Sequence, residues 1–115
     1  MSVTIYHNPR CSKSRKTLQI LEEKGIDFEL VEYLKQAPSE ATLREILGML
    51  DMQARDLMRK NEAAYKELAL DNTELGEDEL VLAMNQNPIL IERPIVVNQG
   101  KARIGRPPEN ILDIL

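Results

Sequence analysis

The sequence predicts an α/β fold built around a small mixed sheet. Strand patterns alternate with helix patterns in the first part of the chain, and two further strand patterns, separated by a turn signal, stand near its end. Alternation predicts parallel βα units, and two strands joined by a tight turn predict a hairpin. We expect one domain over residues 1–115, because this length suffices for one core but not for two.

The first half of the chain contains two strand–helix units. Residues 3–6 alternate apolar and polar side chains, as a half-buried strand does, and Asn8-Pro9 signals a turn. Residues 12–24 favour a helix and precede a glycine suited to a C-cap. Residues 28–33 form the second strand pattern, and Pro38-Ser39 opens an amphipathic helix. Its apolar residues follow helical spacing at Leu43, Ile46, Leu47 and Leu50.

The second half combines helices with a hairpin. Residues 52–73 are charged and only weakly periodic, which predicts short helices and loops. Gly76-Glu77-Asp78 places acids at the start of another helix, where the helix dipole favours them. A buried strand over residues 94–97 is expected to turn at Asn98-Gln99-Gly100 into a second strand over residues 102–104.

The order of these elements predicts the fold more closely. A terminal helix, with Pro107 in its first turn, completes the series βα, βα, extra helices, ββ, α. This is the order of a thioredoxin-like fold with a helical insertion between the second strand and the C-terminal β-hairpin.

Composition narrows the classes of function. No apolar run approaches the ~20 residues needed to span a bilayer, so we expect no membrane partner. A single cysteine cannot form an internal disulfide, which fits a reducing cytoplasm. The net charge is -4, and no basic stripe is interleaved with aromatic residues, so we expect no nucleic-acid partner.

The only cysteine, Cys11, stands in a locally basic stretch between the first strand and the first helix. No acid precedes Glu22. Free N–H groups at a helix start and nearby cations both favour a thiolate, and the same N–H groups can bind an anion. We therefore expect a reactive thiolate, the alternative being an inert, half-buried thiol. The nearby cations are Arg10, Lys13, Arg15 and Lys16.

Ser14 occupies the third position after Cys11, where dithiol oxidoreductases place their resolving cysteine. A serine cannot resolve a disulfide, so the second thiol must come from another molecule. The hydroxyl of Ser14 either donates a hydrogen bond to the thiolate, or Ser14 is an ordinary serine of the first helical turn. His7, the only histidine, is four residues from the thiol and can tune its charge. Without a second histidine or cysteine, we expect no metal site.

Three further arginines are candidates for binding an oxyanion: Arg59, Arg93 and Arg106. Each alone is more often a surface residue. However, Arg93 precedes the proline that opens the buried strand, and in this fold order that proline faces the start of the first helix. Guanidinium groups suit tetrahedral oxyanions through paired, charge-assisted hydrogen bonds.

Four blocks of the chain together resemble one family. They are TIYHNPRCSKSR, LMRKN, NPILIERPIVV and RIGRPPE. In this order they resemble the glutaredoxin-coupled arsenate reductase family, most closely its short YfgD-type branch. The resemblance implies a thioredoxin-like enzyme that reduces arsenate to arsenite, binds no cofactor, and takes glutathione as co-substrate and glutaredoxin as partner.

The resemblance also implies roles for individual residues. Cys11 is the nucleophile and His7 supports thiolate formation. Ser14 and Arg15 shape the anion loop, and Pro94 is the cis proline of the fold. The oxyanion is bound by Arg59, Arg93 and Arg106.

Two other functions remain open. One is a thiol oxidoreductase that uses glutathione on a non-arsenic substrate, which the sequence does not separate from an arsenate reductase. The other is a regulator of the Spx type, which shares the fold and docks on RNA polymerase. Such regulators usually sense oxidants with a Cys-x-x-Cys pair, which Ser14 removes, and docking needs no clamp of three arginines.

Overall fold

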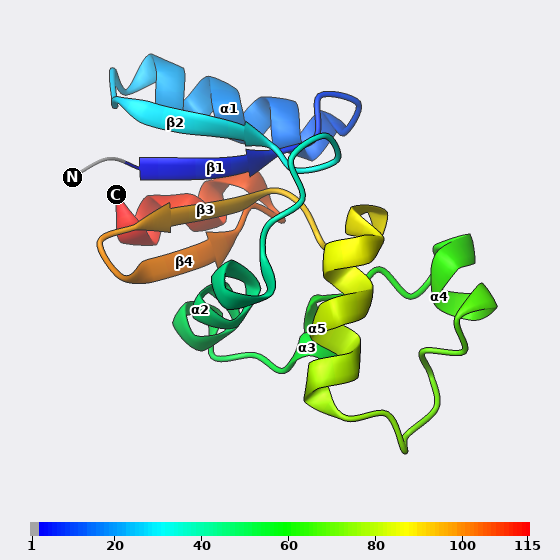
Figure 1. Ribbon diagram of the computed structural model, residues 1–115. Helices are drawn as coiled ribbons and strands as arrows, with labels where there is room; N and C mark the ends of the chain where they lie inside the picture. Colours follow the sequence, from blue (N-terminus) through cyan, green and yellow to red (C-terminus); the bar gives the residue numbers. More distant parts are fainter. Residues whose placement is uncertain (1–2) are drawn as a thin grey trace. The chain divides into compact units, whose positions relative to one another are not determined.

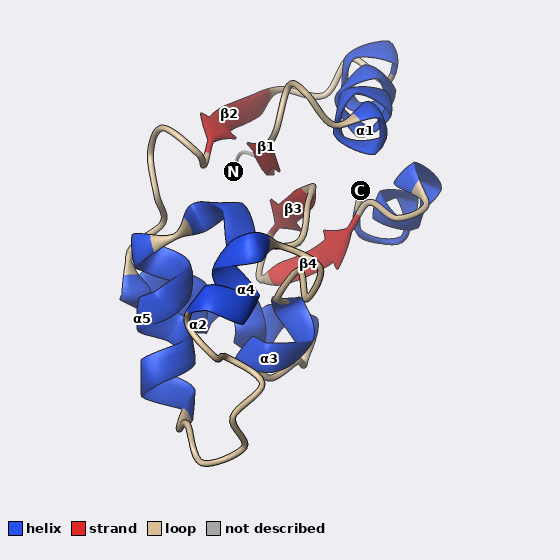
Figure 2. Ribbon diagram, turned by 90° about the vertical axis from the view of Figure 1, so that its right-hand side faces the viewer, coloured by secondary structure: helices blue, strands red, loops and turns tan. Residues whose placement is uncertain are grey.

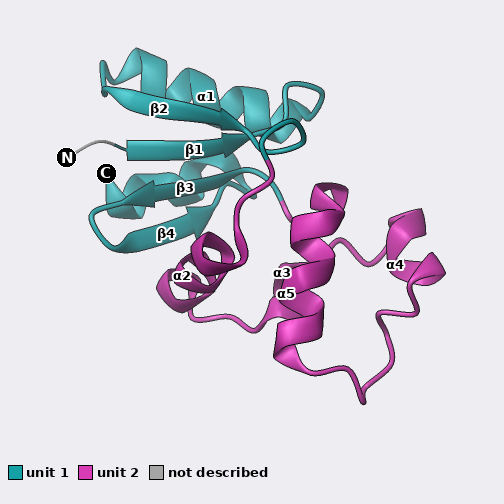
Figure 3. Cartoon of the chain, viewed as in Figure 1, with its two compact units in different colours: residues 1–36, 93–115 teal, residues 37–92 magenta. Residues whose placement is uncertain are grey.

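The computed structural model describes residues 3–115, and Figure 1 shows the order of their helices and strands. The chain divides into two compact units. The first comprises Met1–Gln36 and Arg93–Leu115, and the second comprises Ala37–Glu92 (Figure 3). The single domain expected over residues 1–115 stays a prediction.

The first unit is built on a four-stranded sheet in the order β2-β1-β3-β4. Strand β1 (Val3–His7) runs parallel to β2 (Phe28–Glu32) and antiparallel to β3 (Ile95–Asn98), which pairs antiparallel with β4 (Lys101–Ile104). The two residues between β3 and β4, Gln99 and Gly100, both have positive φ, as a tight hairpin turn requires. The predicted parallel unit and hairpin are therefore confirmed.

Two helices cover one face of this sheet. Figure 2 shows α1 (Ser12–Glu23) and the terminal helix η2 (Pro108–Ile114) on the same side of the strands. Apolar residues from both helices and the strands form one core beneath them. Its buried members are Val3, Ile5, Leu21, Val96, Ile111 and Ile114.

The predicted terminal helix is present but differs in type and start. It is a 3₁₀ helix that begins at Pro108, while Pro107 occupies the preceding cap position. Its buried residues, Pro108, Ile111 and Ile114, recur every three positions. That spacing matches the three residues per turn of a 3₁₀ helix, which turns one row of side chains toward the core.

The buried face of strand β1 ends at His7. Its burial alternates along the strand, so Val3, Ile5 and His7 share one face. Val3 and Ile5 enter the core with residues of α1, and His7 ends the strand on the same side. This places the histidine beside the first turn of α1.

The second unit consists of helices and loops (Figure 2). Helix α2 (Glu40–Leu50) begins after Ser39, whose hydroxyl oxygen accepts a hydrogen bond from the backbone N–H of Thr42 at 3.1 Å. Helix α5 (Glu77–Gln86) follows Gly76 and carries three acids in its first turn. Both helices were predicted.

The charged stretch of the second unit forms short helices, also as predicted. These are α3 (Ala54–Leu57) and α4 (Ala63–Glu67). A 3₁₀ turn, η1 (Pro88–Leu90), was not predicted. Among residues 3–115, no helix combines the length and the apolar character needed to cross a membrane.

Candidate functional site

Cys11 caps the N-terminus of α1 in the first unit. Its backbone is extended, and its carbonyl accepts the first hydrogen bond of the helix, from the N–H of Arg15 at 3.0 Å. Its own N–H donates to the carbonyl of Asn8 at 3.0 Å. The Oδ1 atom of Asn8 accepts from the N–H of Arg10, also at 3.0 Å, so the loop closes on itself. The thiol thus stands where the free N–H groups of the helix begin.

The pKa of the Cys11 thiol is lowered from its ordinary value of 9.0 by this position. Burial raises the pKa, but hydrogen bonds from the backbone N–H groups of Ser14 and Lys13 oppose it, and so do the charges of Arg93 and Arg106. The Nη1 atom of Arg106 lies 3.9 Å from the Cys11 sulfur and also donates to the carbonyl of Arg93 at 3.2 Å. The fold therefore shifts Cys11 toward the thiolate, in the direction that the sequence predicted.

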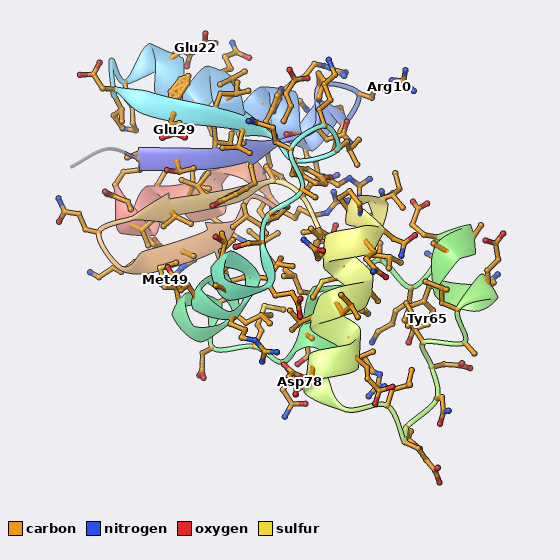
Figure 4. All side chains as sticks on the ribbon, in the orientation of Figure 1. Arg10, Glu22, Glu29, Met49, Tyr65 and Asp78 are labelled. Carbon is orange, nitrogen blue, oxygen red and sulfur yellow. The ribbon has the colours of Figure 1, made fainter. Side chains whose placement is uncertain are left out.

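The source of the positive charge differs from the sequence-based expectation. The four cations near Cys11 in sequence, Arg10, Lys13, Arg15 and Lys16, all have exposed side chains. Figure 4 shows Arg10 extending away from the loop. Water and salt screen such charges, whereas Arg93 and Arg106 are partly buried at the thiol. The side-chain charges that lower the thiol pKa come from Arg93 and Arg106, at the two ends of the hairpin.

The register of the hairpin explains how these two arginines meet. Ile95 and Ile104 are paired across β3 and β4, and the N–H of Gly105 donates to the carbonyl of Pro94 at 2.9 Å. Arg93 precedes Pro94, and Arg106 follows Gly105. This pairing therefore brings the two arginines together at one end of the hairpin. The predicted cis peptide bond between Arg93 and Pro94 is confirmed. A second cis bond, between Arg106 and Pro107, was not predicted.

His7 and Ser14 form a buried pair beneath the thiol loop, the segment over residues 8–11 that joins β1 to α1. The Oγ atom of Ser14 lies 2.6 Å from Nδ1 of His7 and accepts a hydrogen bond from the N–H of Asn8 at 3.0 Å. Burial lowers the pKa of His7; the charge of Glu32 opposes this and that of Arg15 adds to it. The direction of the hydrogen bond between Ser14 and His7 follows the imidazole tautomer. The hydroxyl thus braces the loop, and Ser14 acts on the thiol through its backbone N–H.

The remaining two arginines lie in different settings. Arg15 donates through Nη1 to the carbonyl of Pro9 at 2.9 Å, which ties α1 to the loop before Cys11. Arg59 belongs to the second unit, where its Nη2 atom pairs with Glu62 at 2.7 Å. Substrate contacts of both residues stay predictions.

A cleft of about 390 Å³ borders the thiol loop in the first unit. It is lined by residues 7–10 on one side and by Glu32, Leu34 and Lys35 on the other. His7 therefore forms part of its wall. Within residues 3–115, no group of three or more His, Cys, Asp or Glu side chains is arranged to hold a metal ion.

The sequence analysis assigned no structural role in the site to three residues that shape it. Asn8 was read only as a turn signal, yet its side chain is buried and closes the loop. Thr17 is buried in α1, where its hydroxyl donates to the carbonyl of Lys13 at 2.8 Å. Gly105 packs against Thr17 and Pro94. The glycine before the second Arg-Pro pair was the only local signal for this contact.

The chain matches the ArsC family over residues 6–114. It is 57% identical over 114 residues to the protein YfgD of Escherichia coli strain K12, covering 98% of this chain and 96% of that protein. It is 50% identical over 116 residues to an arsenate reductase of Haemophilus influenzae, covering all of both chains. Among solved structures, an arsenate reductase from Vibrio cholerae superimposes with a TM-score of 0.97 at 51% identity, covering 100% of this chain and 98% of that chain. This chain belongs to the ArsC family.

Proposed function

We propose that this protein is an arsenate reductase that uses Cys11 as its single nucleophile. The observation that carries the proposal is the thiol at the N-terminus of α1 with the guanidinium of Arg106 3.9 Å from its sulfur. The relatives from Haemophilus influenzae and Vibrio cholerae, both named arsenate reductases, support this choice of substrate.

In the first step, the Cys11 thiolate attacks the arsenic atom of arsenate. An arsenic–sulfur bond forms, and one arsenate oxygen leaves as water after protonation. Arg93 and Arg106 offset the negative charge of the oxyanion, and Arg59 and Arg15 are proposed to contribute from their own elements. His7 and Ser14 hold the loop so that the helix N–H groups face the sulfur.

In the second step, glutathione supplies the thiol that this chain lacks. Glutathione attacks the Cys11–arsenate adduct and a second oxygen leaves as water, so arsenic is bound by the two sulfurs. A glutaredoxin thiolate then attacks the glutathione sulfur and forms a mixed disulfide with it, and the electron pair of the broken sulfur–arsenic bond stays on arsenic, which completes the two-electron reduction. Water then releases arsenite and returns the Cys11 thiol. Ser14, at the position of a resolving cysteine, fits this use of external thiols, and the reducing cytoplasm is the proposed compartment.

The test is a coupled assay with arsenate, glutathione and glutaredoxin. We expect the wild-type protein to produce arsenite and Cys11→Ser to fall to the uncatalysed background, because a hydroxyl is a far weaker nucleophile than a thiolate. A thermal unfolding curve of the variant controls for folding.

Two outcomes would point to another function, and a third would exclude Cys11 as the nucleophile. A folded wild-type protein that reduces glutathione mixed disulfides but not arsenate would be a thiol oxidoreductase acting on another substrate. A protein with neither activity that is retained on immobilised RNA polymerase would be a regulator of the Spx type. Arsenite production by Cys11→Ser at the wild-type rate would exclude Cys11 as the nucleophile.

A further inference from the structure

Gly105, between β4 and the cis Arg106-Pro107 bond, lies closer to its neighbours than any residue with a side chain allows. A Cβ atom built on Gly105 would lie 2.5 Å from Oγ1 of Thr17 and 2.9 Å from Cγ of Pro94. Its φ lies outside the positive region that only glycine favours. Space, rather than backbone conformation, is therefore what requires glycine here.

Neither neighbour can yield easily. Thr17 is fully buried in α1, and its Oγ1 atom is held by the hydrogen bond to the carbonyl of Lys13. The ring of Pro94 is rigid, and its carbonyl accepts the hydrogen bond from Gly105 itself. A side chain at position 105 must therefore push the backbone of its own segment away from α1 and Pro94.

The segment that would move carries Arg106. Its N–H donates to the carbonyl of Ile104 at 2.9 Å, so its backbone follows the end of β4. Its guanidinium stands 3.9 Å from the Cys11 sulfur. At this distance a shift of about 1 Å matters, since a misplacement of that size can lower a rate by about 100-fold.

We infer that Gly105 is a positioning residue for the thiol site: its missing side chain lets the Arg106 segment pass close enough to α1 for the guanidinium to reach Cys11. The catalytic consequence rests on the proposed arsenate reductase activity. The effect on the thiol itself does not, because any thiolate at Cys11 is stabilised by a nearby guanidinium.

The central variant is Gly105→Ala, compared with Arg106→Ala and the double variant. Two quantities are measured: kcat/KM for arsenate, and the pH midpoint of Cys11 alkylation by iodoacetamide. We expect Gly105→Ala to lower kcat/KM roughly 10- to 100-fold and to raise the alkylation midpoint toward that of Arg106→Ala. Because Gly105 acts through Arg106, adding Gly105→Ala to Arg106→Ala should change either quantity little further.

Two more variants control for packing and folding. Gly48→Ala in α2 adds a methyl group where nothing lies within 4 Å, so it should leave both quantities at the wild-type values. Thr17→Ala combined with Gly105→Ala removes two of the three closest contacts and should recover part of the loss. If Gly105→Ala alone does not fold, this combined variant carries the test and should still show a raised midpoint and a lowered kcat/KM.

Wild-type kcat/KM and a wild-type midpoint in folded Gly105→Ala would overturn the inference. A double variant whose loss in kcat/KM and shift in midpoint equal the sum of those of the two single variants would also overturn it. Full additivity would show that Gly105 does not act through Arg106. If the wild-type protein does not reduce arsenate but Gly105→Ala still raises the alkylation midpoint, the proposed function fails and the positioning role stands.

Discussion

The two units of the chain hold their arginines in different electrostatic surroundings. In the first unit, Arg93 and Arg106 lower the pKa of a thiol, and Arg106 approaches its sulfur to 3.9 Å. In the second unit, Arg59 pairs with Glu62 at 2.7 Å, and its Nη1 atom donates to the carbonyl of Ile89 at 3.5 Å. Arg93 and Arg106 act directly on the thiol of Cys11. The charge of Arg59 is offset by the carboxylate of Glu62.

An arginine that belongs to one of the family's sequence blocks is therefore not defined electrostatically by its position in the sequence, since its structural partner sets its contribution. A guanidinium paired with a carboxylate must exchange that partner for a substrate oxyanion, which reduces the net gain. We expect Arg93 and Arg106, which act on the Cys11 thiol itself, to matter more for turnover than Arg59, and the predictions below test that ranking.

Among the arginine variants, the largest effect is expected for Arg106→Ala and Arg93→Ala. Each should lower the rate of arsenate reduction by about 30- to 1000-fold, equivalent to roughly 2–4 kcal/mol of lost transition-state stabilisation. Arg106→Lys should recover only part of this loss, because an ammonium lacks the planar fork of a guanidinium. Steady-state kinetics with arsenate measure the effect.

A matched control lies in the same hairpin. Arg103→Ala removes an exposed arginine of β4 that donates to the carbonyl of its own neighbour, Ala102. Its turnover should equal that of the wild type. If Arg59→Ala, Arg93→Ala and Arg106→Ala all keep wild-type turnover, no oxyanion clamp exists.

A smaller effect is expected in the second unit. Arg59→Ala should lower the rate of arsenate reduction near the lower end of that range, about 30-fold. Glu62→Gln removes the competing carboxylate and should lower the KM for arsenate by a few-fold, in keeping with about 1 kcal/mol or less for a partly exposed ion pair. Both are measured from arsenate saturation curves.

An ion pair elsewhere in this unit provides the control. Arg44 and Asp78, the latter labelled in Figure 4, form an exposed ion pair at 2.6 Å. Arg44→Ala should leave both kcat and KM unchanged. A loss for Arg59→Ala larger than that for Arg106→Ala would reverse the proposed ranking of the two units.

The smallest effect concerns stability against pH. The pKa of Cys11 is lower in the folded chain than its ordinary 9.0, so between these two values the unfolded chain binds more protons. The thiolate's contribution to stability is therefore fully present above pH 9.0 and is lost as the pH falls through the folded pKa. His7, whose pKa is also lowered, acts with the same sign from its ordinary 6.5 downward.

Chemical denaturation of the wild type and Cys11→Ser at several pH values measures this contribution. The difference in the free energy of unfolding between them should grow as the pH rises toward 9.0. A difference that stays constant over this range, or an alkylation midpoint of Cys11 at or above 9.0, would show that the fold does not favour the thiolate.

Local patterns predicted much of the fold. Helical spacing located α2, and Ser39 caps it as such a residue should. The turn signal before Lys101 located the hairpin, and Gly100 has the positive φ that such a turn needs. The type of the terminal helix was not predictable in this way, because its three-residue repeat arises from packing on the sheet.

Three features could be predicted from local sequence: one cysteine begins a helix, the third residue after it cannot resolve a disulfide, and a helical insert lies between a strand–helix unit and a hairpin. These features depend on residues a few positions apart. The charges that act on the thiol, by contrast, depend on tertiary contacts. Arg106 is 95 residues from Cys11, and it arrives there through the β3–β4 register and the close contact of Gly105 with α1. Strand pairing and packing distances join segments far apart in the chain, so no local pattern specifies them.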